Sequence, residues 1–220
     1  MKRMVFIMCI LTILSGTLIS MAKPELNDKT FPEPDSLINE KGIQTAVLAG
    51  GCFWGMEGVF ENLKGVTVVI SGFSGGTEET ATYRQVSTGK TGHAESVKIT
   101  YNSSVISFNT LLKVFFSVAH DPTQFNYQGP DKGTEYRSAI FYTNEQQKKA
   151  ALDYINLLNK SGIFADKIVT EVSPFKAFYP AEYYHQDFMS NNPDYPYIVY
   201  WDKPKLEHLI REYPQLVKNK

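Results

Sequence analysis

The feature that most constrains the fold is a change of hydrophobic period at Gly50-Gly51. The preceding apolar run TAVLA, residues 45–49, is typical of a short buried strand. A β-branched run at 66–70 predicts a second strand after the helical stretch and its stop at Gly65. Between the two strands, apolar residues recur at the spacing of a helix: Phe53, Met56, Val59, Phe60 and Leu63.

The same order of elements continues along the chain. Residues 96–101 alternate between apolar and polar as a half-buried strand does, and Ser107 is placed to cap a following helix. Further strands are expected at 136–142 and 168–172, and further helices at 144–158 and 206–213. This order predicts an α/β (α+β) fold: a single-domain two-layer sandwich with a mixed sheet covered by helices and a ferredoxin-like core. Long loops at 77–92 and 120–135 and an irregular, Tyr-rich C-terminal segment complete the prediction.

The first residues have the pattern of a secretory signal peptide. Lys2 and Arg3 precede an apolar run at 4–14, and Ser20-Met21-Ala22 fits a small-x-small cleavage site. An uncleaved membrane anchor is the less favoured alternative, because polar residues interrupt the run and a spanning helix needs about 20 mostly apolar residues. We therefore expect export to a periplasm or secretion, with a signal peptide at 1–22, an extended arm at 23–43, a folded domain at 44–214 and a tail at 215–220.

Composition excludes several classes of function. The 22 Lys and Arg residues nearly balance the 23 Asp and Glu residues, which argues against a nucleic-acid partner. Cys9 and Cys52 cannot build a disulfide framework, and neither has a Cys or His partner at zinc spacing, so we expect no metal and no bound cofactor. Because Cys9 would leave with the signal peptide, the mature chain would keep the single thiol of Cys52.

Cys52 stands where the first predicted strand gives way to a helix. The first amides of a helix lack intrahelical partners and carry the positive end of its dipole, which favours a thiolate and predicts a lowered pKa for this thiol. The adjacent glycines allow close approach of a ligand, and Phe53-Trp54 suggest an apolar pocket. These features favour a reactive cysteine, whereas a lone Cys is more commonly a buried structural residue.

Glu95 is in phase with the apolar face of the strand at 96–101. That face carries Val97, Ile99 and Tyr101. A carboxyl group held against apolar surface has its pKa raised above about 4.3, which keeps a general acid protonated near neutral pH. In the alternative, Glu95 leans into water or pairs with Lys98 or Arg84.

Histidines and tyrosines supply further candidates. A Cys–His nucleophile or a metal site is one interpretation, but ordinary hydrogen bonding is favoured because the loop histidines have no recognised ligand spacing: His93, His120 and His185. Tyr83 and Tyr136 flank the two long loops, and either is unremarkable as a half-buried packing residue by itself.

Five ordered motifs resemble those of the peptide methionine sulfoxide reductase A family. GCFWG at 51–55 resembles the nucleophile motif, and GFSGG at 72–76 resembles the following Gly-Tyr-x-Gly-Gly, with Phe73 in place of the usual Tyr. The other blocks are TY at 82–83 with GHAE at 92–95, HDPTQ at 120–124 with residues 129–138, and FYPAE at 178–182 with YHQ at 184–186. The resemblance covers about 45–213, so it implies that the domain at 44–214 is catalytic.

The resemblance implies reduction of methionine S-sulfoxide, free or in proteins, and a role for each matched residue. Cys52 would attack the sulfoxide sulfur and become a sulfenic acid, while Glu95 would protonate the oxygen. Tyr83 and Tyr136 would donate hydrogen bonds to that oxygen. The residues that bind the substrate or support it through a polar network would be Phe53, Trp54, Asp131 and His185.

One departure from the family concerns the recycling of Cys52. Many members carry a resolving cysteine near the C-terminus, often in the region that corresponds to 196–198, but no cysteine follows Cys52 here. The expected reductant is therefore an external thiol: a thioredoxin-like or glutaredoxin-like protein, or a small thiol, acting on a monomer. Pro130 also replaces the Asn that is common before the acidic residue at 131.

Two other classes of function remain open from the residues alone. A cysteine hydrolase or acyltransferase would use Cys52 with His185, and it predicts ester or amide turnover that His185→Ala blocks. A non-catalytic module would present the Tyr-rich segment to a partner, with Cys52 merely buried.

Overall fold

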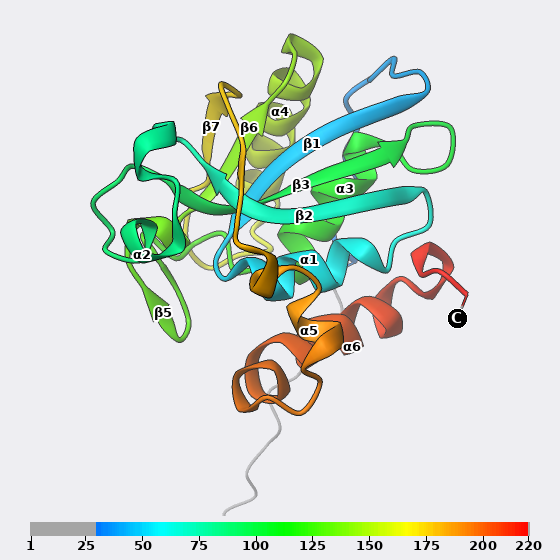
Figure 1. Cartoon of the computed structure of the whole chain (residues 1–220). Helices are drawn as coiled ribbons and strands as arrows, with labels where there is room; N and C mark the ends of the chain where they lie inside the picture. The colour runs from blue at the N-terminus through cyan, green and yellow to red at the C-terminus, as the bar shows by residue number, and fades with distance from the viewer. Residues whose placement is uncertain (1–29, 220) are drawn as a thin grey trace, which may run out of the picture. The chain divides into compact units, whose positions relative to one another are not determined.

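The protein is seen in a computed structural model that describes residues 30–219 (Figure 1). The strands of its main sheet are β1 (Ile43–Gly50), β2 (Val66–Ser74), β3 (Ala94–Asn102), β6 (Ser138–Tyr142), β7 (Glu171–Pro174) and β8 (Tyr179–Pro180). They lie in the order β7-β6-β1-β3-β2-β8. β7 runs parallel to β6 and every other pair is antiparallel, so the sheet is mixed, as predicted.

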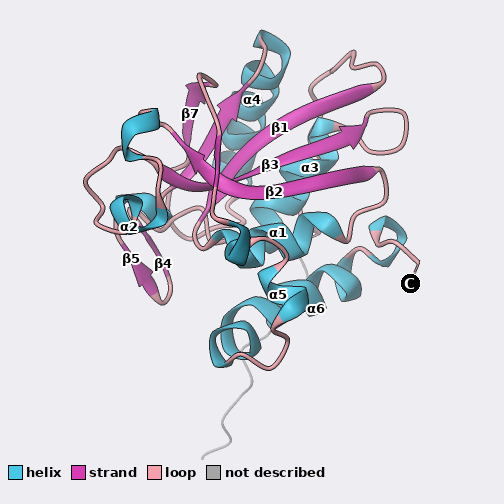
Figure 2. Cartoon of the chain, viewed as in Figure 1, coloured by secondary structure: helices cyan, strands magenta, loops and turns pink. Residues whose placement is uncertain are grey.

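The four central strands and two helices form the predicted ferredoxin-like core. α1 (Phe53–Glu61) connects β1 to β2, and α3 (Phe108–Val114) lies between β3 and β6. The antiparallel order β6-β1-β3-β2 is that of a split β-α-β unit. α4 (Glu145–Ser161) then leads to β7 (Figure 2). The predicted fold class is therefore confirmed for the described part of the chain.

The side-chain alternation of β1 explains its continuous apolar run. Ala46 and Leu48 belong to the large core that the helices close, whereas Val47 and Ala49 belong to a smaller cluster on the other face. The segment 175–178 packs against that second cluster. A strand that is buried on both faces loses the apolar–polar alternation of a half-exposed strand.

Both long loops contain more local structure than the sequence predicts. The first carries a short helix, α2 (Tyr83–Val86), and the second carries a hairpin of β4 (Tyr127–Gln128) and β5 (Asp131–Lys132). The strand predicted at 136–142 begins only at Ser138, because Thr134–Tyr136 form a 3-10 turn.

The C-terminal segment is irregular, as predicted, but it contains short helical pieces. These are α5 (Phe188–Asn191), a π-helical turn (Ile198–Asp202) and α6 (Lys203–Glu212). α6 starts three residues before the predicted helix, and the strand predicted at 168–172 is displaced toward the C-terminus as β7. The segment packs on α1, so it delivers residues to the helix that follows Cys52.

Residues 31–42 contain no helix or strand and are tied to the domain by hydrogen bonds. The Tyr154 hydroxyl donates to the Pro32 carbonyl at 2.7 Å, and the Tyr101 hydroxyl donates to a Glu40 carboxyl oxygen at 2.6 Å. The predicted signal peptide at 1–22 and the first residues of the predicted arm lie outside the described residues.

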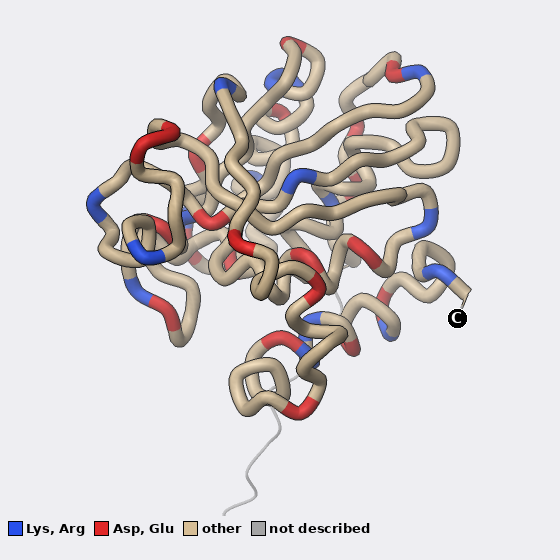
Figure 3. Tube along the Cα trace, in the orientation of Figure 1, with Lys and Arg blue, Asp and Glu red and all other residues tan. Residues whose placement is uncertain are grey.

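Acidic and basic residues are interspersed along the described chain (Figure 3). Between residues 30 and 219, no helix combines the length and the apolar character that crossing a membrane requires.

Candidate active site

Cys52 lies at the junction of β1 and α1, where it is the N-cap residue of the helix. Only 8% of its surface is exposed. Gly51, just before it, has a φ of +91°, and a Cβ at this position would lie 2.5 Å from Cγ of Gln128. Glycine is therefore required at 51, since any other residue would combine a strained backbone with a clash. This tight junction fixes the cysteine at the start of the helix.

Glu95 comes from β3 and meets the same helix start. Its Oε2 accepts a hydrogen bond from the backbone N–H of Phe53 at 3.1 Å, and 2% of the residue is exposed. Phe73 is its partner in the register of β2 and β3, so the two side chains share one face of the sheet. The carboxyl group is thus enclosed by protein beside Cys52, as the strand alternation predicts, and does not lean into water.

Burial raises the pKa of Glu95 to about 8. The hydrogen bond from Phe53 opposes this rise, while the charges of Asp131, Glu135 and Asp202 add to it. A carboxylic acid with such a pKa is mostly neutral at pH 7. This raised pKa agrees with the prediction of a protonated acid beside the thiol.

Tyr83 and Tyr136 bring two phenol groups to the same place. Burial raises the pKa of Tyr83 to about 12, and the charges of Glu95 and Cys52 contribute to the rise. The pKa of Tyr136 is also raised, first by burial and then by Glu95 and Asp131. Both hydroxyl groups therefore stay protonated and remain hydrogen-bond donors at neutral pH.

Asp131 is joined to the site by a residue that the sequence analysis did not select. The Tyr197 hydroxyl donates a hydrogen bond to the Asp131 carboxylate. The Tyr197 ring stands edge-on to Trp54, with the ring centres 5.8 Å apart. The abundance of tyrosines after Pro174 was visible in the sequence, but that segment has no period that would single out Tyr197.

Trp54 is held by a cage of aromatic side chains. Its indole stacks on Phe188 at a centroid distance of 3.8 Å, and its Nε1–H donates to Nδ1 of His185 at 3.2 Å. His185 is 2% exposed, and its ring centre is 5.1 Å from that of Phe53. The structure therefore brings Phe53, Trp54 and His185 together, with His185 orienting the indole.

His93 and His120 have ordinary structural roles. The ring of His93 bonds to the Thr77 carbonyl at 2.9 Å and accepts from the N–H of Gly76 at 3.2 Å. The ring of His120 bonds to the Phe115 carbonyl at 2.9 Å and to the Ser138 hydroxyl at 2.7 Å. Hydrogen bonding is thus the role of these histidines, as the sequence analysis favoured.

The prediction of a lowered pKa for Cys52 is wrong for the resting structure. The pKa of the thiol is raised, first by burial and then by the charges of Glu95 and Asp202. The N–H of Trp54 and the charge of Lys205 act in the opposite direction. The start of α1 does favour a thiolate, but two carboxyl groups from distant parts of the chain face the same helix end.

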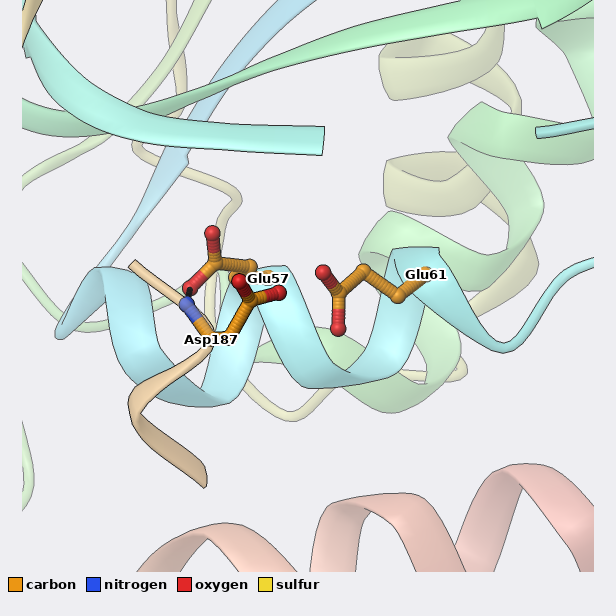
Figure 4. A group of neighbouring side chains, drawn as sticks. All are labelled: Glu57, Glu61 and Asp187. Atoms are coloured by element: carbon orange, nitrogen blue, oxygen red, sulfur yellow. Dashed lines mark hydrogen bonds between the residues drawn. The ribbon is translucent and has the colours of Figure 1, made fainter. Parts of the chain in front are cut away.

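One set of acidic side chains among residues 30–219 is close enough together to hold a cation. Glu57, Glu61 and Asp187 each offer an oxygen atom within 4.8 Å of the others (Figure 4). Burial raises the pKa of Glu57 to about 8 and that of Glu61 to about 7, so protons compete for these oxygens. Glu57 also accepts the backbone N–H of Asp187 at 3.0 Å, which ties α1 to the start of α5.

Comparison with known proteins gives one consistent family. The family model described as peptide methionine sulfoxide reductase matches residues 44–216. Peptide methionine sulfoxide reductase MsrA 2 of Mesorhizobium japonicum is 54% identical over 179 residues, which cover 81% of this chain and 92% of the relative. MsrA 2 of Synechocystis sp. is 51% identical over 195 residues, which cover 86% of this chain and 91% of the relative.

Solved structures show the same likeness. Reduced Mxr1 from Saccharomyces cerevisiae superposes with a TM-score of 0.66 at 32% identity, and the match covers 76% of this chain and 94% of that one. Methionine sulfoxide reductase A of Corynebacterium diphtheriae gives a TM-score of 0.61 at 34% identity, covering 74% and 82% of the two chains.

Proposed function

Since this chain belongs to the peptide methionine sulfoxide reductase family, we propose that it reduces methionine S-sulfoxide, free or in proteins, with Cys52 as the nucleophile. One observation carries the proposal: a buried acid stands at the residue next to the thiol. Glu95 accepts the N–H of Phe53 at 3.1 Å, and its pKa of about 8 keeps it neutral at pH 7.

A neutral acid beside a thiol fits the chemistry of a sulfoxide. The sulfur of Cys52 attacks the sulfoxide sulfur, and Glu95 donates a proton to the oxygen as the S–O bond breaks. The attack forms an S–S bond, and the oxygen, which also takes the proton of the thiol, leaves as water. This water then adds to the sulfur of Cys52 as the S–S bond breaks, so methionine leaves, Cys52 becomes a sulfenic acid, and the remaining proton returns to Glu95. Sulfur is reduced in the substrate and oxidised in Cys52, so the step balances.

The neighbouring groups supply binding and orientation. The protonated hydroxyl groups of Tyr83 and Tyr136 donate hydrogen bonds to the sulfoxide oxygen, while Asp131 anchors the supporting network through Tyr197. Phe53 and Trp54 offer apolar surface to the methyl group of the substrate, and His185 fixes the indole. The hydrolase alternative has no comparable support, because Trp54 donates its N–H to Nδ1 of His185, which puts the proton of the neutral ring on Nε2 and leaves His185 no free lone pair with which to act as a base.

Recycling of the sulfenic acid requires a thiol from outside the domain. Cys52 is the one cysteine after residue 9, so no second thiol between residues 30 and 219 can form a disulfide with it. A thioredoxin-like or glutaredoxin-like protein, or a small thiol, would attack the sulfenic sulfur and release water, and a second thiol would resolve the mixed disulfide. With the signal peptide at 1–22, this repair would serve exported proteins in a periplasm or outside the cell.

The decisive assay is the dithiothreitol-dependent reduction of the two resolved epimers of a methionine sulfoxide peptide. We expect turnover of the S epimer alone, abolished in Cys52→Ser and retained in the matched control Cys9→Ser. Hydrolysis of an ester substrate by the wild-type chain without any sulfoxide turnover would overturn the proposal in favour of the hydrolase.

A further inference from the structure

A buried ion pair lies against the first turn of α1. The Lys205 ammonium donates to Oδ1 of Asp202 at 3.2 Å, and the exposed fractions of the two side chains are 19% and 0%. Oδ2 of Asp202 is buried and has no hydrogen-bond partner among the described residues. A fully buried carboxylate with one free oxygen is costly, so its place beside the active site calls for a functional explanation.

Gly55 allows this ion pair to reach the helix start. A Cβ on Gly55 would lie 2.1 Å from Oδ1 of Asp202 and 3.0 Å from Nζ of Lys205. Gly55 is the third residue of α1, in the same turn as the N-cap residue Cys52. The carboxylate therefore sits at the positive end of the helix, where an anion is stabilised.

Three acidic groups thus share one helix start. Glu95 takes the N–H of Phe53, Asp202 packs on Gly55, and Cys52 itself would be the third anion. Like charges at one site oppose one another, so each carboxylate makes ionisation of the thiol harder. The ionisable groups whose charges act on Cys52, or that feel its charge, come from several elements: Glu95, Tyr83, Tyr136, Tyr197, Asp202 and Lys205.

We propose that Asp202 and Lys205 are positioning residues that set the ionisation of Cys52 in opposite directions. Asp202 helps to hold the resting nucleophile as a thiol by placing a negative charge beside the first turn of α1, and Lys205 limits this effect by pairing with Asp202 beside the same turn. Because thiolates react with oxidants far faster than thiols, this arrangement protects a repair enzyme whose single active-site thiol works under oxidising conditions.

The test is the pH profile of Cys52 alkylation by iodoacetamide in the full chain, followed by mass spectrometry of the Cys52 peptide. Asp202→Asn removes the negative charge and is expected to speed alkylation at pH 7 by about three- to tenfold, with the midpoint moved to lower pH. Lys205→Met is expected to slow alkylation by a similar factor, with the midpoint at higher pH. The double variant should return toward the wild-type profile.

Asp194→Asn is the matched control, because Asp194 lies in the same C-terminal segment but pairs with Lys203 at the surface at 3.9 Å. It should leave the profile unchanged. A variant that merely loosens the fold would expose Cys52 and lower the midpoint whichever charge is removed, so shifts in opposite directions identify a charge effect, and circular dichroism checks folding. If Asp202→Asn does not fold, the proposal is judged by whether Lys205→Met moves the midpoint of Cys52 alkylation to higher pH.

The proposal is overturned if the two variants shift the midpoint in the same direction, or if neither shifts it. The experiment rests on Cys52 as the nucleophile of the proposed function, but it uses no sulfoxide. Its outcome is therefore separate from the outcome of the epimer assay.

Discussion

Glu95→Gln is the substitution that most directly tests the chemistry of the site. Glutamine keeps the size of the side chain and an oxygen that can accept the N–H of Phe53, now at 3.1 Å, but it has no proton to give. With a pKa of about 8, Glu95 is protonated in about nine of ten molecules at pH 7, so the wild-type enzyme has almost its full supply of acid.

The expected loss follows from the role of the proton. A positioned general acid contributes about 10²- to 10⁴-fold in rate, which is about 3–5 kcal/mol of transition-state stabilisation. Because the sulfoxide oxygen leaves poorly without a proton, we expect kcat/KM to fall by that factor. The formation of Cys52 sulfenic acid in a single turnover without reductant should slow equally, since this step precedes any attack by an external thiol.

Glu57→Gln is the matched control for this variant. Glu57 is also 2% exposed, has a pKa raised to about 8, and accepts a backbone N–H, from Asp187, at 3.0 Å. It therefore reproduces the burial and hydrogen bonding of Glu95 away from the thiol, and its variant should keep near-wild-type turnover. An unchanged single-turnover rate in Glu95→Gln, or an equal loss in both variants, would refute the assignment of Glu95 as the acid.

Three further predictions concern the rest of the site and the fold. Tyr83→Phe and Tyr136→Phe should each reduce kcat/KM by about tenfold, and the double variant by more, because each removes one donor to the sulfoxide oxygen; steady-state kinetics with dithiothreitol measures this. Mass spectrometry after sulfoxide treatment without reductant should find one added oxygen on Cys52, trapped by dimedone, and an intramolecular disulfide of the domain would contradict the recycling scheme. The raised pKa of Glu57 makes the folded state bind a proton more tightly than the unfolded state, in which the pKa of this side chain is near 4.5. The contribution of this proton to stability is full below about pH 4.5 and is lost as pH rises through about 8. Urea unfolding should therefore show that the fall in stability between pH 5 and pH 8.5 is smaller by about 4 kcal/mol in Glu57→Gln, at about 1.4 kcal/mol for each of roughly three pH units, and equal falls in the two proteins would contradict it.

The parts of the site that lie on regular elements were predictable from sequence. The two-residue alternation of β3 placed Glu95 on the buried face, and the change of period after Gly51 placed Cys52 at a helix start. Both are local consequences of backbone geometry, and the register of Phe73 with Glu95 confirms the face. Motif resemblance was needed to bring in Tyr83 and Tyr136, since a half-buried tyrosine in a loop carries no period.

The residues that were missed come from the irregular C-terminal segment. The packing of that segment on α1 brings Tyr197, Asp202 and Lys205 toward Cys52. No spacing in the sequence indicates such a contact. Asp202, one of these missed residues, also contributes to the error about the thiol. A helix start evaluated by itself has one positive end and one cysteine, whereas the folded protein buries the thiol and adds Glu95 and Asp202 near it.

This correction makes a prediction about the pH dependence of the reaction itself. If Cys52 were a resting thiolate of low pKa, the rate of sulfenic acid formation would rise with pH through that pKa and fall again when Glu95 loses its proton, which gives a bell. With both groups protonated at rest, the fraction of molecules that have a thiolate and a neutral Glu95 also rises with pH, but this rise continues up to the pKa of Glu95, about 8. We expect the thiol to pass its proton within the substrate complex as the oxygen is protonated. No thiolate is then needed at rest, so single-turnover rates should be flat from pH 6 to 8. The rates should then fall above about pH 8. Stopped-flow fluorescence of Trp54, recorded in a Trp201→Phe background because the chain has two tryptophans, follows this step, and an acid limb centred near pH 6 would show that the resting cysteine is a thiolate after all.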